Sequence, residues 1–347
     1  MPKVSLILSA YNAAGTLGET LSSLSTSTLD DWEAVIVNDA SQDATGDILE
    51  EFSRKEHRVR LLHNDINLGL AASLNRAINA SQSPYLARLD ADDIQLPQRL
   101  KRQTTFLDAH SNVGILGMGA YTIDGTGRPL GYKPPVPTVA ISWAKLWRVA
   151  FIHPTVMMRR KLLDEHDFRY NEDFSLAQDF ELWSRILNVT QGANLSQPGI
   201  RYRVHAGQAT KAKINHRLDL HRQVSRMMLS SIIQTPIKDN MLEAQRAYFL
   251  GEAARGEAVP DLHEALIWRE AVAEKAFLST GCMSSKLGLG LDLWHLLRNR
   301  KYDRENFNVK SRRRNLLKSG PVLLKHRLQY QFWKLKGNLG KITIRHT

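Results

Sequence analysis

The sequence predicts an α/β protein with a doubly wound, mostly parallel sheet, followed by a C-terminal helical region and a basic tail. Three observations predict this architecture. Over residues 4–109, apolar runs of strand length alternate with helical patterns, as in parallel α/β sheets. Polar residues follow these runs at the ends where open α/β sheets bind ligands. Beyond residue 215 the strand signal fades, and residues 281–347 are strongly basic.

Four apolar runs bounded by turn residues mark the first strands, at Val4–Ser9, Trp32–Val37, Val59–His63 and Tyr85–Leu89. Between them, apolar residues recur at helical spacing. This spacing predicts helices at Asn12–Leu24, from Asp43 past Phe52, and at Leu70–Asn79. Asp43 is expected to cap the second of these helices because its carboxylate can accept hydrogen bonds from the first-turn N–H groups.

The pattern changes after a fourth helix, which is expected to begin at Pro97 and end at Ala109. Two short strands and a turn follow, and the proline-rich segment Lys133–Pro137 is expected to be irregular because proline cannot donate to a ladder. The later elements are predicted as strands at Gly114–Met118, Ala120–Ile123 and Thr155–Met158 and as helices at Ala140–Val149 and Ala177–Leu187.

Composition restricts the class of protein. The chain has 347 residues, 43% of them hydrophobic, and one cysteine, Cys282, which excludes an intramolecular disulfide and a cysteine-rich zinc site. No run approaches the ~20 apolar residues that a membrane-spanning helix needs. The N-terminus lacks a signal-peptide pattern. These features predict a protein that is cytoplasmic or lies on the cytoplasmic face of the plasma membrane.

The net charge of +12 comes from the C-terminal tail. Residues 281–347 hold sixteen Lys and Arg against three acidic residues, with aromatic residues interleaved, so the rest of the chain is close to neutral. The tail could bind an anionic membrane surface, contact nucleic acid, or be a solvated appendage. No nucleic-acid motif accompanies the charge, so the membrane surface is favoured. We expect three regions, at 1–215, 216–280 and 281–347.

Three carboxylates crowd together just after the fourth strand, in the sequence Arg88-Leu89-Asp90-Ala91-Asp92-Asp93. In an extended segment Asp90 and Asp92 point to the same side and could share one divalent cation. The alternative is a solvated acidic loop, with Asp93 as the cap of the following helix. Like charges this close repel one another unless a cation or hydrogen-bond donors compensate.

Polar residues also follow the first two strands, at Ser9–Asn12 and at Asp39. A carboxylate at Asp39 can accept the N3–H of uracil or thymine, so these positions suit a nucleotide. No Gly-x-Gly-x-x-Gly or Gly-Lys-Ser/Thr motif is present to cradle phosphates. A diphosphate would therefore need neutralising in another way, and a metal ion on Asp92 would do so.

With these residues in place, the chain resembles the glycosyltransferase family 2 enzymes, which have the GT-A fold. The resemblance covers about residues 3–210, and the matching blocks occur in the family's order. They are Val4–Asn12, Val35–Asp43, Asn67–Gly69 with Leu74–Asn75, Arg88–Asp93 as the DxD motif, Gln178–Arg185 and Tyr202–His205.

On the donor side, the resemblance implies that Asp39 binds the nucleotide base and that Ala10 and Asn12 line its pocket. Asp92 would coordinate Mn²⁺ or Mg²⁺ bridging the diphosphate, acting as a Lewis acid on the leaving group. The remaining implied contacts are Asp90 on the ribose or the metal's water shell and Arg88 near the phosphates.

On the acceptor side, the resemblance implies that Asp179 is the general base for the acceptor hydroxyl. It would lie near a helix N-terminus, where a carboxylate is favoured, and the alternative is an ordinary first-turn acid. The family usually has an acidic residue just before this base, whereas this chain has Gln178. His205 could contact metal or phosphate, or be a structural residue.

The function implied is inverting transfer of a sugar from a UDP- or dTDP-sugar to a hydroxyl of a glycan or lipid-linked acceptor. Cell-envelope polysaccharide or glycolipid synthesis is the setting expected. Two alternatives stay open. A non-catalytic protein of the same fold could keep the nucleotide-sugar pocket, which the departure at Gln178 allows. A nucleotidyltransferase also uses acidic metal ligands, but the glycine-rich and basic loop expected after its first strand is missing.

Overall fold

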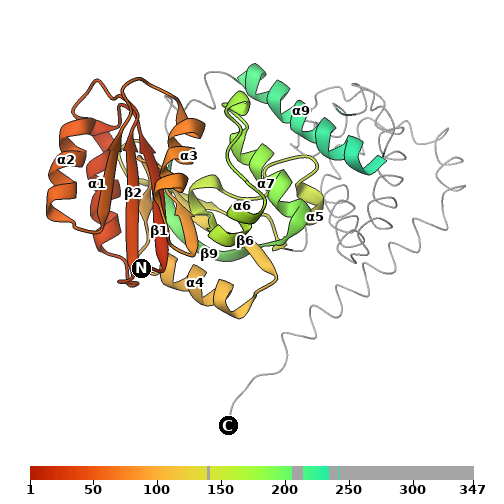
Figure 1. Ribbon diagram of the computed structural model, residues 1–347, viewed down its shortest axis with the longest axis horizontal. Helices are drawn as coiled ribbons and strands as arrows, with labels where there is room; N and C mark the ends of the chain where they lie inside the picture. The colour runs from red at the N-terminus through yellow and green to blue at the C-terminus, as the bar shows by residue number, and fades with distance from the viewer. Residues whose placement is uncertain (139–140, 205–213, 234–241, 243–347) are drawn as a thin grey trace, which may run out of the picture.

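The computed structural model describes residues 1–138, 141–204, 214–233 and 242. Within these residues the strands form a single nine-stranded sheet, with helices packed on both faces (Figure 1). The α/β fold class predicted from the sequence is therefore confirmed. The order of strands along the main path is β3-β2-β1-β4-β8-β6-β9-β5, and β7 pairs with β6 outside that path.

The first half of the sheet is parallel, because each strand is followed by a helix that returns the chain to the same edge. β1 is central here and pairs in parallel with both β2 and β4, while β2 pairs with β3. The elements are β1 (Val4–Ala10), α1 (Ala14–Ser25), β2 (Trp32–Asn38), α2 (Thr45–Lys55), β3 (Val59–His63), α3 (Leu70–Ala80) and β4 (Tyr85–Arg88).

The second half of the sheet is mixed. β8 lies antiparallel between β4 and β6, and the long β9 runs parallel to β6 and pairs antiparallel with β5. The elements are β5 (Ile94–Gln95), α4 (Arg99–Ala109), β6 (Val113–Asp124), β7 (Pro129–Lys133), α5 (Ile141–Ala144), β8 (Met157–Arg159), α6 (Arg160–Glu165), α7 (Gln178–Val189), β9 (Gln191–Val204) and α9 (Ile214–Ile233).

Each face of the sheet has its own hydrophobic core, because neighbouring side chains on a strand point to opposite faces. On β1, Leu6 and Leu8 pack with residues of α1, α2 and α4, whereas Ile7 packs with residues of α3, α6 and α7. A third cluster joins α7 to α9 through side chains such as Phe180 and Val224. Burial on both faces explains why β1 and β2 are almost continuous apolar runs.

The structure corrects the predicted division of the segment 113–124. Two strands were expected on either side of Gly119, but the chain forms the single strand β6. A Cβ atom at Gly117 would collide with Asn194, and one at Gly119 would collide with Tyr132. These glycines therefore allow neighbouring side chains to approach the strand, and they do not end it.

The sequence reasoning missed three strands, namely β5, β7 and β9, and misplaced two helices. β7 includes Lys133, which was expected to be irregular, and β9 has a polar, proline-containing sequence without clear alternation. The helix expected at Ala140–Val149 is the short α5, and the helix expected from Pro97 begins at Arg99. Between Asp93 and that helix lies β5, so Asp93 does not cap it.

Of the predicted C-terminal regions, only α9 and residue 242 fall within the described residues, and the basic tail 281–347 lies outside them. α9 packs on α7, so the expected helical character after residue 215 is seen for this stretch. In the described part of the chain, no helix combines the length and the apolar character needed to cross a bilayer.

Thr155 offers a test of how the mixed half of the sheet is held together. The register between β6 and β9 shifts after Met118, and the buried Thr155 hydroxyl accepts from the Met118 N–H at 3.0 Å. Thr155→Val keeps the shape but leaves that N–H unpaired, so we expect a loss of about 1–3 kcal/mol in the free energy of unfolding. Urea unfolding measures the loss.

The control is Thr155→Ser, which keeps the hydroxyl and removes one buried methyl group, at a cost of about 0.8 kcal/mol. A valine variant as stable as the wild type would contradict the proposed role of the hydroxyl in this part of the sheet.

Candidate active site

The residues singled out in the sequence gather at the carboxyl edge of the parallel strands. Asp39 directly follows β2, and the acidic turn at Asp90–Asp93 follows β4, with β1 between the two strands. Helix α1 is tied to the acidic turn because Thr20 donates to the Ala91 carbonyl at 2.9 Å. This edge is where open α/β sheets place their ligands.

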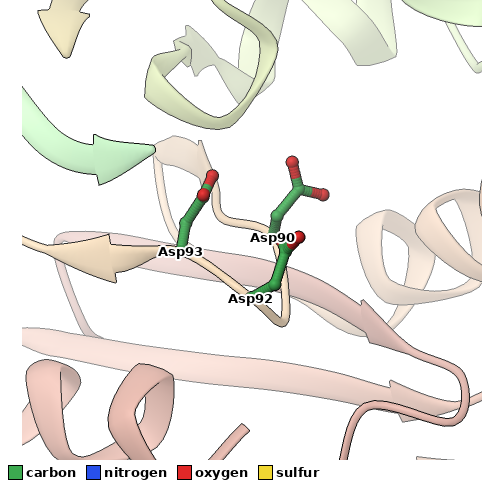
Figure 2. Close-up of side chains that lie close together, drawn as sticks. All are labelled: Asp90, Asp92 and Asp93. Atoms are coloured by element: carbon green, nitrogen blue, oxygen red, sulfur yellow. The ribbon is translucent and has the colours of Figure 1, made fainter. Parts of the chain in front are cut away.

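The acidic turn brings three carboxylates together. Oxygens of Asp90, Asp92 and Asp93 lie within 4.8 Å of one another. Figure 2 shows their carboxyl groups rising to the same side of the turn. Asp93 is fully buried, and its Oδ1 accepts from the Arg203 N–H at 2.8 Å. Burial, together with repulsion from the other two carboxylates, raises the pKa of Asp93 well above its ordinary value.

A buried arginine faces this turn. Arg88, at the end of β4, is 1% exposed and forms an ion pair with Asp90. Burial opposes its charge, but the attraction and hydrogen bond of Asp90, together with the attraction of Tyr170 and Asp93, outweigh that cost, so the pKa of Arg88 is raised. Its Nε and Nη1 groups have no hydrogen-bond partner among the described residues. Arg88 is thus poised to donate to a further acceptor.

A second buried arginine, Arg99, supports Arg88 from helix α4. Its Nη2 donates to the main-chain carbonyl of Arg88 at 2.7 Å. Burial and the repulsion of Arg88 lower the pKa of Arg99 to about 9. Two cations this close are tolerable only with anions nearby, and the attraction of Asp93 favours the charge on both.

The donor set of the acidic turn fits a hard divalent cation. Carboxylate oxygens are the ligands that Mg²⁺ and Mn²⁺ prefer. The buried Oδ2 of Asp93 has no partner among the described residues, which leaves acceptor capacity inside the cluster. A cation there would also compensate the repulsion that raises the pKa of Asp93. Asp90 and Asp92 are partly exposed and could both reach the ion.

Asp39 lies at the carboxyl edge of the parallel strands, and its side chain also holds the loop that precedes α3 through hydrogen bonds. It is 2% exposed, and its carboxylate accepts three hydrogen bonds, from Asn64 at 2.6 Å, from the Leu68 N–H at 2.8 Å and from the Gly69 N–H at 2.9 Å. Gly69 has φ +86°, a conformation that favours glycine. Only Oδ1 receives two bonds, so Oδ2 keeps room for one more donor.

Asn12 and Ala10 connect the first two loops at this edge. The Ala10 carbonyl accepts from the Asp39 N–H at 2.9 Å, and Asn12 Oδ1 accepts from the Gln42 N–H at 2.8 Å. Asn12 adopts φ +47°, which an asparagine tolerates better than most residues. Asp43, predicted as a helix cap, accepts from the Thr45 N–H at 2.9 Å at the start of α2.

Asp179 lies at the N-terminus of α7, as predicted, and faces the acidic turn. It is half-buried, and its Oδ1 accepts from the Phe180 N–H at 2.8 Å. Burial raises its pKa, and the attraction of Arg88 opposes that rise. Because Arg88 and Asp90 both act on Asp179, the structure brings the predicted base and the predicted metal turn into one site.

An aromatic cluster lies beside Asp179. The His153 ring and the Tyr170 hydroxyl are 3.0 Å apart, and both rings contact Trp183 of α7. Burial and the positive charge of Arg88 lower the pKa of His153 well below its usual range. His153 is therefore neutral, and it shares one hydrogen bond with the Tyr170 hydroxyl.

Lys133 and Tyr202 come from elements that the sequence reasoning did not predict. The ammonium of Lys133 lies 4.6 Å from the centroid of the Tyr202 ring. Burial lowers the pKa of Lys133, and the attraction of Asp93 and Asp179 opposes that shift. The hairpin β6–β7 therefore brings a cation, Lys133, close to Asp93 and Asp179.

Several predicted site residues thus share one region, namely Arg88, Asp90, Asp92 and Asp179. His205 lies outside the described residues. Sequence reasoning missed Lys133 and Tyr170, which had no motif to mark them. Arg203 belonged to a block noted in the sequence, but nothing there indicated its contacts with the acidic turn. Gln178 is buried, and its side-chain oxygen lacks a partner among the described residues.

Comparison with known proteins now identifies the family. Residues 5–167 match the model for glycosyl transferase family 2. An uncharacterized glycosyltransferase of Haemophilus influenzae is 32% identical over 226 residues, which cover 62% of this chain and 69% of the relative. The succinoglycan biosynthesis protein ExoU of Rhizobium meliloti is 28% identical over 241 residues, covering 64% and 65% of the two chains.

Among solved structures, S. aureus TarS 1-349 in complex with UDP-GlcNAc superposes with a TM-score of 0.54 at 21% identity. The match covers 90% of this chain and 92% of that one, and it supports the GT-A fold. The chain belongs to glycosyltransferase family 2, and it is an enzyme of the glycosyltransferase class.

Asp93 offers a test of the electrostatics of the site. Its folded-state pKa is raised, so the folded protein holds this proton more tightly than the unfolded chain, and stability is lost as pH rises from the unfolded pKa towards the folded one. Asp93→Asn removes that titration and keeps an oxygen that can accept from Arg203. In EDTA, we expect the variant to gain stability over the wild type by up to about 1.4 kcal/mol per pH unit across this window.

Urea unfolding at a series of pH values from 4 upward measures the difference, with Asp173→Asn, an exposed acid, as the control. A difference between Asp93→Asn and wild type that is the same at every pH would contradict the raised pKa.

Proposed function

We propose that this glycosyltransferase is an inverting, metal-dependent enzyme that transfers a sugar from a UDP- or dTDP-sugar to a hydroxyl of a glycan or lipid-linked acceptor. The observation that carries the proposal is that Asp179 lies close to the acidic turn and to Arg88. Burial raises the pKa of Asp179. One side of this site is built to hold an anionic leaving group, and the other to take a proton.

On the donor side, Asp39 would accept the N3–H of the base with the capacity left on Oδ2. Ala10 and Asn12 hold the neighbouring loop and would border the base. Asp92, with Asp90 beside it, would hold Mn²⁺ or Mg²⁺, which when bound supplies Lewis-acid stabilisation of the diphosphate.

Arg88 has a separate role on the leaving group. Its Nε and Nη1 groups have no partner among the described residues, and they belong to a buried guanidinium whose Nη2 pairs with Asp90. A diphosphate oxygen would satisfy them, and such donors act most strongly when they are preorganised and shielded from water. Arg88 would therefore stabilise the charge that develops as the sugar–phosphate bond breaks.

On the acceptor side, Asp179 would accept the proton of the attacking hydroxyl. The hydroxyl oxygen forms a bond to the anomeric carbon while the bond to the diphosphate breaks on the opposite side, which inverts the configuration. A raised pKa makes Asp179 a stronger base than an exposed aspartate. The hydrogen bond from the Phe180 N–H orients the carboxylate.

The relatives support the choice of substrates. TarS was solved with UDP-GlcNAc, and ExoU is named for succinoglycan biosynthesis. We therefore propose a uridine or thymidine nucleotide donor and a role in cell-envelope polysaccharide or glycolipid synthesis. The basic tail at 281–347 suits an anionic membrane surface, where a lipid-linked acceptor would lie, so we propose a cytoplasmic enzyme that docks on that face.

Two observations disfavour the alternative functions, a nucleotidyltransferase and a non-catalytic binding protein. Family membership places the chain among transferases of sugars, which disfavours a nucleotidyltransferase. A non-catalytic binding protein would not need Asp179 at a helix N-terminus beside a buried arginine. The glutamine at position 178 removes a carboxylate that the family usually has, but it leaves Asp179 in place.

Asp179→Asn tests the base directly. The substitution keeps the size and the hydrogen bond from Phe180 but cannot take a proton, so we expect turnover to fall by about 10²- to 10⁴-fold. Because the base must be deprotonated, wild-type kcat/KM should fall at low pH with a midpoint above the ~3.9 of an exposed aspartate. The donor for this assay is the UDP- or dTDP-sugar that most raises the Tm of the protein. Release of UDP or dTDP from that donor measures turnover.

Asp173→Asn, a neighbouring exposed acid, serves as the matched control and should keep full turnover. Donor binding should persist in Asp179→Asn, since this residue acts on the acceptor. Full turnover in that variant would remove the base assignment.

A further inference from the structure

Arg203 connects three separate parts of the chain around the acidic turn. It lies near the end of β9 and is 1% exposed. Its main-chain N–H and its side chain together contact the acidic turn, the loop between β6 and β7, and helix α1. The acidic turn has little regular structure of its own to hold it, because β5, which directly follows it, has only two residues.

Two of these bonds hold the acidic turn itself. The Arg203 N–H donates to Asp93 Oδ1 at 2.8 Å, and Arg203 Nε donates to the main-chain carbonyl of Asp92 at 2.8 Å. One bond fixes a side chain and the other fixes the main chain of the preceding residue. Rotation of the peptide between Asp92 and Asp93 would break both of them. Arg203 therefore holds the main chain that carries the Asp92 carboxylate.

The rest of the guanidinium binds outside the turn. Nη1 donates to the Gly125 carbonyl at 3.1 Å, in the β6–β7 loop, and Nη2 pairs with Glu19 of α1 at 2.9 Å. A planar guanidinium can serve these acceptors at once, whereas a lysine ammonium could reach only part of the set. The Glu19 side chain is 56% exposed, so this end of the arrangement is open to solvent.

We infer that Arg203 is a positioning residue for the metal site: it holds the Asp92–Asp93 peptide so that the carboxylates of the acidic turn keep a geometry that binds a divalent cation. This inference rests on the proposed function, which supplies the metal. The contacts of Arg203 with main-chain carbonyls, Asp93 and Glu19 act on the metal site through the acidic turn. Groups that orient ligands in this way commonly change metal affinity by 10- to 100-fold when they are lost.

Binding of Mn²⁺ to the full chain in the presence of UDP tests the inference, with free Mn²⁺ measured by electron paramagnetic resonance. In Arg203→Lys we expect the Kd for Mn²⁺ to rise by about 10-fold or more. The Kd for UDP in EDTA should stay within about 2-fold of the wild type, because the base-binding loops do not depend on Arg203. Purely structural damage would instead lower the fraction of protein that binds and leave both constants unchanged.

Arg58→Lys is the matched control. Like Arg203, Arg58 pairs with a glutamate: it binds Glu56 through Nε at 2.8 Å and Nη2 at 2.7 Å, but it precedes β3 at the opposite edge of the sheet. Its Mn²⁺ affinity should equal that of the wild type. A general sensitivity of the fold to arginine replacement would show up in this variant as well.

The outcomes separate the inference from the proposed function. A wild type that does not bind Mn²⁺ with UDP would overturn the metal site on which the inference rests. A wild type that binds Mn²⁺, with equal affinity in Arg203→Lys, would overturn the positioning role alone. If circular dichroism shows that Arg203→Lys does not fold, Glu19→Gln replaces it, with an expected 2- to 3-fold weaker Mn²⁺ affinity. Unchanged affinity there would likewise overturn the inference.

Discussion

The repulsion among the three carboxylates of the acidic turn is the interaction around which the rest of this structure is arranged. Their oxygens lie within 4.8 Å of one another, and burial of Asp93 removes the solvent that would screen them. The positive charges of two buried arginines, Arg88 and Arg99, partly compensate that negative charge. The balance is incomplete, as two features of Asp93 indicate: its pKa is raised, and its Oδ2 has no hydrogen-bond partner in the described part of the chain. A divalent cation would complete it.

The mixed half of the sheet, which follows β4, supplies residues that act on this charge. The parallel half alone would place Asp39 and the acidic turn at one edge, as in any open α/β sheet. The mixed half adds what that edge lacks. β9 supplies Arg203, which holds the acidic turn, and α7 supplies Asp179. The β6–β7 hairpin brings Lys133 close to Asp93 and Asp179. In the proposed mechanism these later elements form the acceptor side of the site.

The parallel half was predictable from the sequence because β1, β2 and β4 are buried on both faces and read as nearly continuous apolar runs. Asp39, Asp90 and Asp92 could be placed for the same reason, since each directly follows such a run. The mixed half was not predictable in this way. β9 is polar along much of its length, and β6 contains glycines at positions 117 and 119 that make room for neighbours from distant parts of the chain. The contacts of Arg203 depend on that packing, so no local pattern could reveal them.

A crystal structure of the full chain with UDP and Mn²⁺, with the ion located by its anomalous scattering, tests the central claim most directly. The account predicts one Mn²⁺ bound directly to the Asp92 carboxylate and to diphosphate oxygens. It also predicts that the uracil N3–H faces Asp39 and that an Arg88 N–H group donates to the diphosphate. A bound UDP with no Mn²⁺ at the acidic turn, or with its base away from Asp39, would contradict it.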